Sequence, residues 1–132
     1  MQPLHSDILP GGIVFLKISG NLTKDTIPGV KAGIEQNLKM IQDQYLALGG
    51  KVPYLVDMSE FTGVYDAEIL ELFAAFAKGT RDLVAKATIY GGSLSTELIA
   101  KMIVMISGRN DMEVFHTKEE ALAALNVPGV QA

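Results

Sequence analysis

Five side chains with a carboxylate or an aliphatic hydroxyl gather in one short stretch near the middle of the chain: Asp57, Ser59, Glu60, Thr62 and Asp66. Carboxylates and hydroxyls in a single segment can recognise a partner or hold a hard divalent cation, which takes oxygen ligands. The simpler interpretation, which we favour, is that Asp57 and Ser59 hydrogen-bond the local backbone while Asp66 caps a helix. We therefore predict no metal and no cofactor here, and we expect a recognition surface because of where the stretch lies in the predicted fold.

The residues around this stretch place it at the end of a strand. Tyr54-Leu55-Val56 follows Pro53, is too short for a helix and has no polar face, which predicts a central strand covered on both sides. The chain should then form a loop that turns at Gly63, and Asp66 should start a helix. The apolar stripe of that helix is Ile69, Leu72, Phe73 and Phe76. Because partners of open α/β sheets meet the carboxyl ends of strands, we expect the loop and Ile69 to form the surface.

The rest of the chain alternates strands with helices. Strands are predicted at residues 13–18, 85–90 and 113–115, with an edge strand at 5–9. Helices are predicted from Asp25 or Thr26 to Gly49, at about 96–107, and after a capping box at 117–120. Strands that alternate with helices imply a single-domain α/β fold with a mainly parallel sheet. The core should span about residues 13–126, with 127–132 as a tail.

Composition excludes several classes of function. The 132 residues are 48% hydrophobic and 20% charged, which suits one globular domain. A net charge of −4 without a basic stripe argues against nucleic-acid binding. The absence of cysteine excludes disulfides, thiolate metal sites and cysteine nucleophiles. The sequence shows neither a secretory signal pattern nor an apolar run long enough to span a bilayer, so we expect a cytoplasmic protein.

No catalytic constellation is recognisable. The chain has no GxSxG elbow, and His116 precedes a helix cap without an obvious acid or base partner, which favours a structural role. Gly91-Gly92-Ser93 could cradle a phosphate with backbone N–H groups, but it lacks the spaced glycines and the lysine of a nucleotide loop. A plain turn is the better interpretation, and we predict that the protein is not an enzyme.

The helix predicted at about residues 96–107 is apolar nearly all round in its second half. A helix that covers one face of a sheet does not need this much apolar surface. If Met102 and Met105 were exposed, they would form a patch that soluble monomers seldom carry. A partner surface, a self-association surface or a lipid-receiving groove would each explain the pattern. The alternative is that the first or last helix buries part of it.

Three segments, spread over most of the chain after Gly12, carry a resemblance to a known family. Residues 20–23 with Thr26 look like its strand-exit motif, residues 56–59 through Asp66 look like its signature loop, and residues 114–122 look like its closing strand and helix. In order and spacing these segments resemble the STAS domains of anti-sigma-factor antagonists and sulfate-transporter tails. The long first helix is nearer to the poorly characterised STAS-like relatives, some of them grouped with lipid-carrying CRAL-TRIO modules.

The resemblance implies a four- or five-stranded sheet with about four helices packed mainly on one side, and a role in binding other proteins. In the antagonists, a partner kinase phosphorylates a serine just after the aspartate that opens the second helix, and the added charge blocks binding. Here that aspartate looks like Asp66, and Ala67 follows it, so the matching position has no hydroxyl. Ser59 and Thr62 are the remaining candidate phosphorylation sites of the stretch.

These observations support two hypotheses from different classes. The first is a non-enzymatic STAS-like interaction module, a homodimer that binds a regulator or kinase-like protein through residues 57–69 and is controlled by phosphorylation. The alternative is a carrier of a small apolar or lipid ligand. Its pocket would be lined by Phe73, Phe76, Met102 and Met105.

Overall fold

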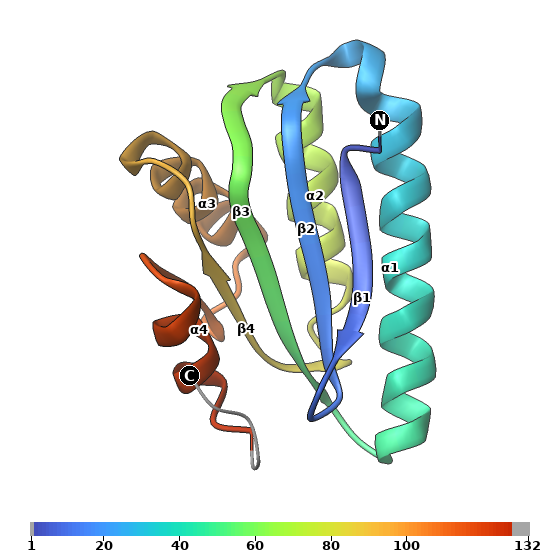
Figure 1. Ribbon diagram of the computed structural model, residues 1–132. Coiled ribbons are helices and arrows are strands. Elements are labelled where there is room, and N and C mark those ends of the chain that lie inside the picture. The colour runs from blue at the N-terminus through green and yellow to red at the C-terminus, as the bar shows by residue number, and fades with distance from the viewer. Residues whose placement is uncertain (1, 128–132) are drawn as a thin grey trace.

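Five strands form one sheet in the same order as they occur in the chain (Figure 1). The computed structural model describes residues 2–127, so most of the predicted tail at 127–132 lies outside the described residues. The strands are β1 (Leu4–Leu9), β2 (Ile13–Leu22), β3 (Val52–Tyr65), β4 (Val84–Tyr90) and β5 (Met112–Phe115). β1 runs antiparallel to β2 and all later pairs are parallel, which confirms the predicted mainly parallel sheet and its antiparallel edge strand.

Three helices cover one face of the sheet and a fourth covers the other. The helices are α1 (Ile27–Leu48), α2 (Ala67–Gly79), α3 (Leu94–Ser107) and α4 (Lys118–Leu125), with a short 3₁₀ turn at Lys24–Thr26. Each parallel crossover advances by one strand in the same direction, and right-handed crossovers of that kind place α1, α2 and α3 on one face. Figure 1 shows α4 on the opposite side of the sheet from α2, and α1 and α3 at the two ends of the helix layer.

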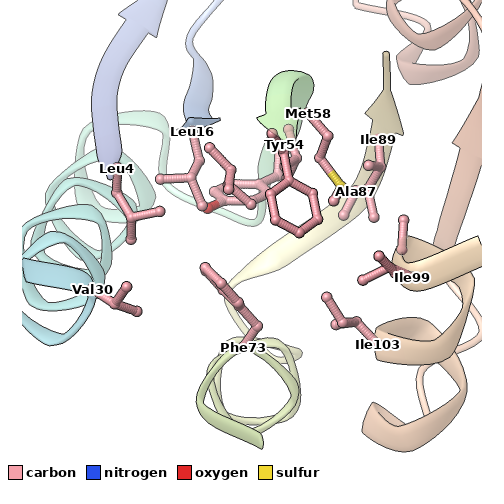
Figure 2. Packing of buried hydrophobic residues seen from close by; sticks show 14 of the residues in the cluster. Leu4, Leu16, Val30, Tyr54, Met58, Phe73, Ala87, Ile89, Ile99 and Ile103 are labelled. Carbon is pink, nitrogen blue, oxygen red and sulfur yellow. The ribbon is translucent and has the colours of Figure 1, made fainter. Parts of the chain in front are cut away.

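Each face of the sheet has its own core. The larger core joins α1, α2 and α3 to the sheet, and Figure 2 shows Phe73 of α2 reaching toward Tyr54 and Leu16 while Ile103 approaches from α3. The smaller core lies under α4 and is formed by Ile13, Leu55, Tyr90, Ala121 and Leu125. Strand β3 contributes to both, which confirms that a central strand passes through Tyr54-Leu55-Val56.

The predicted loop at residues 57–66 is wrong, because β3 continues as a strand to Tyr65. The partner strand β2 also runs further than predicted, to Leu22, and pairs Ser19 with Glu60 and Gly20 with Phe61. The register between the two strands shifts twice in this region, so the polar residues are accommodated by β-bulges. Phe61, which is only 5% exposed, anchors the extension to the core.

Helix α3 begins at Leu94, two residues earlier than predicted, because Ser93 caps it: Ser93 Oγ accepts a hydrogen bond from the N–H of Thr96. Ile99, Ala100 and Ile103 face the sheet and are buried. Its outward side is not buried by α1 or α4, since Met102 is 41% and Met105 is 79% exposed. Burial by the first or last helix therefore does not account for Met102 and Met105.

Candidate functional site

The outward residues of the β3 extension form one exposed surface, which we call the carboxyl-edge surface: Ser59, Glu60, Thr62 and Val64. Phe61 between them points inward, as expected where alternate residues of a strand face opposite sides. Val64 is 50% exposed, and sequence reasoning missed it as a candidate residue. The surface therefore combines an anion, two hydroxyls and one apolar side chain on a single strand.

Asp57 lies beneath this surface and holds its first residue in place. The side chain is buried, and Asp57 Oδ1 accepts a hydrogen bond of 2.8 Å from the N–H of Ser59. Tyr90 lies close by: its burial, followed by the negative charge of Asp57, raises the pKa of the Tyr90 phenol. Asp57 thus serves the local backbone, in agreement with the interpretation favoured from the sequence.

Gly91 makes the close approach between β4 and β3 possible. A Cβ at this position would lie 2.7 Å from the backbone nitrogen of Ser59, and the glycine has a φ of +92°. Both the contact and the backbone conformation therefore require glycine. The Gly91-Gly92-Ser93 segment is a turn that supports Ser59 and leads into α3.

Glu60 pairs with a lysine of the neighbouring strand. The Lys17 ammonium forms an ion pair with the Glu60 carboxylate, and the hydrogen bond to Glu60 raises the pKa of Lys17. Lys17 and Glu60 are 30% and 54% exposed at their side chains, so the pair belongs to the solvated surface and contributes little to stability. Its charges are available to a partner.

The Thr62 hydroxyl is committed to internal hydrogen bonds. It donates toward the Asn21 side-chain oxygen and lies 3.2 Å from the Gly20 carbonyl oxygen, and it accepts a 3.2 Å bond from the N–H of Val64. These contacts join β2 to β3 across the extension. Of the two predicted phosphorylation sites, Thr62 therefore has a structural task, while Ser59 is exposed and its backbone alone is bonded to Asp57.

Asp66 occupies the N-cap position of α2, as predicted, but its carboxylate does not cap that helix. Asp66 Oδ2 instead accepts a 2.7 Å hydrogen bond from the N–H of Lys24, and the Asp66 N–H donates to the Leu22 carbonyl at 2.9 Å. These two bonds tie the exit of β3 to the exit of β2. Ala67 follows at an exposed position.

Ile69 is not part of the carboxyl-edge surface, which corrects the sequence prediction. Its exposed fraction is 0%, and it packs in the larger core. The apolar stripe of α2 therefore accounts for this residue completely. The predicted oxygen cluster is also divided, because Asp57 and Asp66 each serve a different backbone segment. Within residues 2–127, no three acidic or histidine side chains come together as a metal site would require.

A side-chain contact near the same edge of the sheet was missed by sequence reasoning. His116, which follows β5, pairs through Nδ1 with Glu97 Oε1, and Glu97 is 7% exposed although it lies in the first turn of α3. The pair links α3 to the segment that leads into α4. Glu97 and His116 are 19 positions apart in the chain, so no spacing rule would have joined them.

The apolar space between the sheet and the helices is an internal cavity of about 50 Å³. Phe73 and Phe76 line it from α2, and its lining residues with polar side-chain atoms are Tyr54, Thr80 and Arg109. A separate groove of about 360 Å³ lies between α1 and α2, and Phe76 and Thr80 line that groove as well. The predicted apolar pocket is thus partly wrong: Phe73 and Phe76 meet in a cavity, whereas Met102 and Met105 lie on the solvent side of α3.

Arg109 lies at the end of this cavity and makes several hydrogen bonds there. Its guanidinium binds both oxygens of Asp111, at 2.8 and 2.6 Å, and donates to the Ala77 carbonyl at 2.9 Å. The guanidinium holds the pKa of Asp111 below its ordinary value. The arrangement fixes the end of α3 against α2.

Comparison with known proteins identifies the fold. The chain matches no family model and no curated protein. It is similar to the crystal structure of an uncharacterised protein of the DUF3478 family from Shewanella loihica PV-4, described as having a SpoIIAA-like fold. The match has 14% sequence identity and a TM-score of 0.61, and it covers 92% of this chain and 91% of that chain. The chain therefore has a SpoIIAA-like fold, which confirms the STAS-like fold predicted from the sequence. None of its described helices is long and apolar enough to cross a membrane.

Proposed function

We propose that this SpoIIAA-like chain is a non-enzymatic module that binds a regulatory or kinase-like protein in the cytoplasm through the carboxyl-edge surface. The observation that carries the proposal is that Ser59, Glu60, Thr62 and Val64 are exposed on a strand whose backbone is fixed from below. A partner that meets a rigid surface loses less conformational entropy on binding than one that must order a loop. Specific recognition requires binding residues that a rigid part of the fold holds in position.

The shape of this edge favours a protein over a small molecule. The strand order follows the chain, so the sheet has no point at which the order reverses and opens a crevice between strands. The internal cavity and the groove between α1 and α2 are both lined by other residues. Small ligands need a concave site that covers most of their surface, whereas a protein partner can bind a projecting strand pair.

Phosphorylation of Ser59 would control this surface. A phosphate there would add between one and two negative charges next to Glu60 and close to the buried Asp57. The added negative charge would lower the affinity for a partner that recognises the present balance of charge between Lys17 and Glu60. Ser59 is the better of the two candidate sites, because modification of Thr62 would break the contacts that join β2 to β3.

Site-specific photo-crosslinking in the host cell would test the proposal. A photoreactive residue at Glu60 should give one discrete adduct, and Ser59→Asp introduced into the same chain should abolish it. The control carries the same photoreactive residue at Glu35, an exposed position on α1. The proposal is wrong if both positions give the same adducts, or if the adduct at Glu60 is unaffected by Thr62→Arg and Val64→Arg.

A second function, transport of a small apolar ligand, is favoured by one observation. Phe76 and Thr80 line both the internal cavity and the open groove, so the Phe76 ring is a partition between them. A cavity of about 50 Å³ is too small for a lipid. Displacement of the ring would join it to the groove of about 360 Å³, within the usual size range of ligand sites.

Uptake of a fluorescent fatty-acid probe would test this second function. Phe76→Ala removes the partition and should bind the probe at least ten times more tightly than the unmodified chain. Leu46→Ala, an equally simple truncation at an exposed leucine of α1, should have no effect. Equal and weak probe binding by the unmodified chain and both variants would refute the carrier hypothesis.

A further inference from the structure

The outward side of α3 carries an exposed apolar stripe that neither proposed function uses. Its members, which we call the α3 stripe, are Leu94 (72% exposed), Leu98 (56%), Met102 (41%), Met105 (79%) and Ile106 (57%). The opposite side of the same helix, with Ile99 and Ile103, is buried against the sheet. Burial in this chain therefore explains only half of the apolar residues of α3.

The stripe has the geometry of a helix-packing ridge. Leu94, Leu98, Met102 and Ile106 follow one another at intervals of four residues, so they form one row along the helix. At 1.5 Å per residue, the row is about 18 Å long. Met105 lies beside it, one turn after Met102. Rows of this type interdigitate when two helices cross, which is the commonest form of helix packing in globular proteins.

The area of the stripe matches what a dimer interface needs. Given their exposed fractions, the five side chains together present on the order of 500 Å², in the upper part of the range for the largest apolar patch of a soluble monomer. Two such stripes face to face would bury on the order of 1,000 Å², which is where specific interfaces begin. A second stripe of the same kind is therefore sufficient to cover the first.

We propose that the α3 stripe is the interface of a homodimer in which α3 packs against α3 of a second copy about a two-fold axis. The row has its midpoint between Leu98 and Met102, so the axis passes there and Leu98 of one copy faces Met102 of the other. A two-fold contact uses the same patch twice, which a self-complementary apolar row allows. Because α3 lies at the end of the helix layer, none of the other helices within residues 2–127 covers its outward side (Figure 1).

The charges of α3 favour a second copy over a lipid surface. Lys101 is the one exposed charged side chain of the helix, since the carboxylate of Glu97 is turned inward to His116. Helices that lie on membranes carry many basic residues on their polar face, and anionic headgroups repel a chain with a net charge of −4. Because the stripe has no exposed carboxylates, two copies that meet there do not bring negative charges together.

Sedimentation equilibrium over a range of chain concentrations tests the proposal directly. The unmodified chain should approach twice its monomer mass, and Met105→Glu should raise the dimer dissociation constant at least ten-fold by placing a carboxylate from each copy in the interface. Leu46→Glu is the matched control, because Leu46 is 77% exposed on α1 and Met105 is 79% exposed on α3. An unmodified chain that stays monomeric at several hundred micromolar would overturn the proposal, as would equal effects of the two variants.

Disulfide trapping tests the position of the axis, since the chain has no cysteine of its own. Chains with Leu98→Cys and chains with Met102→Cys, mixed and oxidised, should form mixed dimers faster than either chain crosslinks with itself. Faster self-crosslinking of either chain would refute the two-fold arrangement. Recruitment of a monomeric chain to vesicles of phosphatidylcholine and phosphatidylglycerol, lost in Met105→Glu, would assign the stripe to a lipid surface instead. Each of these readouts is independent of partner binding at the carboxyl-edge surface, so the dimer and the proposed function can fail separately.

Discussion

Replacing Tyr54 by phenylalanine should lower the free energy of unfolding by about 1–3 kcal/mol, because it leaves a buried amide oxygen without its donor. Asn37 lies on α1 with an exposed fraction of 0%, and its side-chain oxygen accepts a hydrogen bond from the Tyr54 hydroxyl of β3. Its amide nitrogen donates to Ser6 Oγ at 2.9 Å and to the Phe15 carbonyl at 3.3 Å. One side chain thus joins the long helix to three strands.

A double-mutant cycle separates the hydrogen bond from the other effects. Asn37→Leu alone should cost about 2–4 kcal/mol, because the Tyr54 hydroxyl is left buried without a partner and the two donor bonds are lost. In Asn37→Leu with Tyr54→Phe, both unsatisfied groups are gone. The double variant should therefore be more stable than the sum of the single changes by about 1–3 kcal/mol. The loss of the bonds to Ser6 and Phe15 occurs in both arms that contain Asn37→Leu, so it cancels.

Urea unfolding followed by circular dichroism measures all four free energies, provided that the m-value is the same for each protein. Single changes that add without coupling would refute the buried bond between Tyr54 and Asn37. So would a Tyr54→Phe variant as stable as the unmodified chain. A changed m-value would show that the comparison itself is invalid, in which case hydrogen exchange of the α1 amides gives the same four energies.

The pH dependence of the same variants provides an additional prediction. Burial raises the pKa of Tyr54 far above that of a free phenol, so the unfolded chain loses this proton first as the pH rises. The stabilisation is therefore fully present below about pH 10 and declines above it, by up to about 1.4 kcal/mol per pH unit for each such tyrosine. Tyr90, whose pKa is also raised, acts in the same direction. Tyr54→Phe should remove its own share of the alkaline decline, and an unchanged slope between pH 10 and 11 would contradict the argument.

Arg109→Met should destabilise the chain by about 2–3 kcal/mol in urea unfolding, because it leaves the partly buried carboxylate of Asp111 without its partner. A variant as stable as the unmodified chain would contradict this pairing. Because Arg109 lowers the pKa of Asp111, the stabilisation by this pair is present above about pH 4 and declines below it; Asp111→Asn should flatten that acid decline. Gly91→Ala should cost at least about 1 kcal/mol more than Gly49→Ala, because both glycines have positive φ but only Gly91 would bring a Cβ within 2.7 Å of Ser59 N. Equal losses from the two alanines in thermal unfolding would show that the contact with Ser59 is not tight.

The helices and the mainly parallel sheet were predictable because their signals are local. The long helix was placed from its apolar repeat and its terminal glycine, and the structure ends α1 at a left-handed Gly49. The capping box at Thr117 was read from four residues and is present with both of its hydrogen bonds. The alternation of strands and helices then predicted a mainly parallel sheet, because a helix between two strands lets the chain cross over and begin the next strand in the same direction, with right-handed crossovers.

The β3 extension was missed because its signal is not local. Polar side chains at Asp57, Ser59 and Glu60 followed by Gly63 have the composition of a loop, and only pairing with residues of β2 makes the segment a strand. Those partners lie about 40 positions earlier in the chain. Ser59, Glu60 and Thr62 were therefore placed at the end of the central strand, but with the wrong backbone conformation.

Asn37 was missed although the sequence contained its signal. The helix repeat runs through Val30 and Ile41, and position 37 falls on the same side of α1, where the structure buries it with Gly33. A polar residue on an apolar stripe predicts a buried hydrogen bond, because an unsatisfied amide in that place would be costly. Tyr54, the hydroxyl-bearing residue of the buried segment Tyr54-Leu55-Val56, was the matching donor.

The strand order also explains why the candidate surfaces lie where they do. Because every parallel crossover moves in one direction, three helices form a layer with two ends, and the sheet contains no reversal that could open a crevice. Recognition must then use the strand ends, the space beneath the helices, or the outer helix at an end of the layer. Helix α3 has a neighbour on only one side, so elementary physics predicts a polar outer side for it. That it carries Leu98, Met102 and Met105 there instead is understandable if the layer continues into a second copy, where α3 gains on its free side the packing that α2 provides on the other.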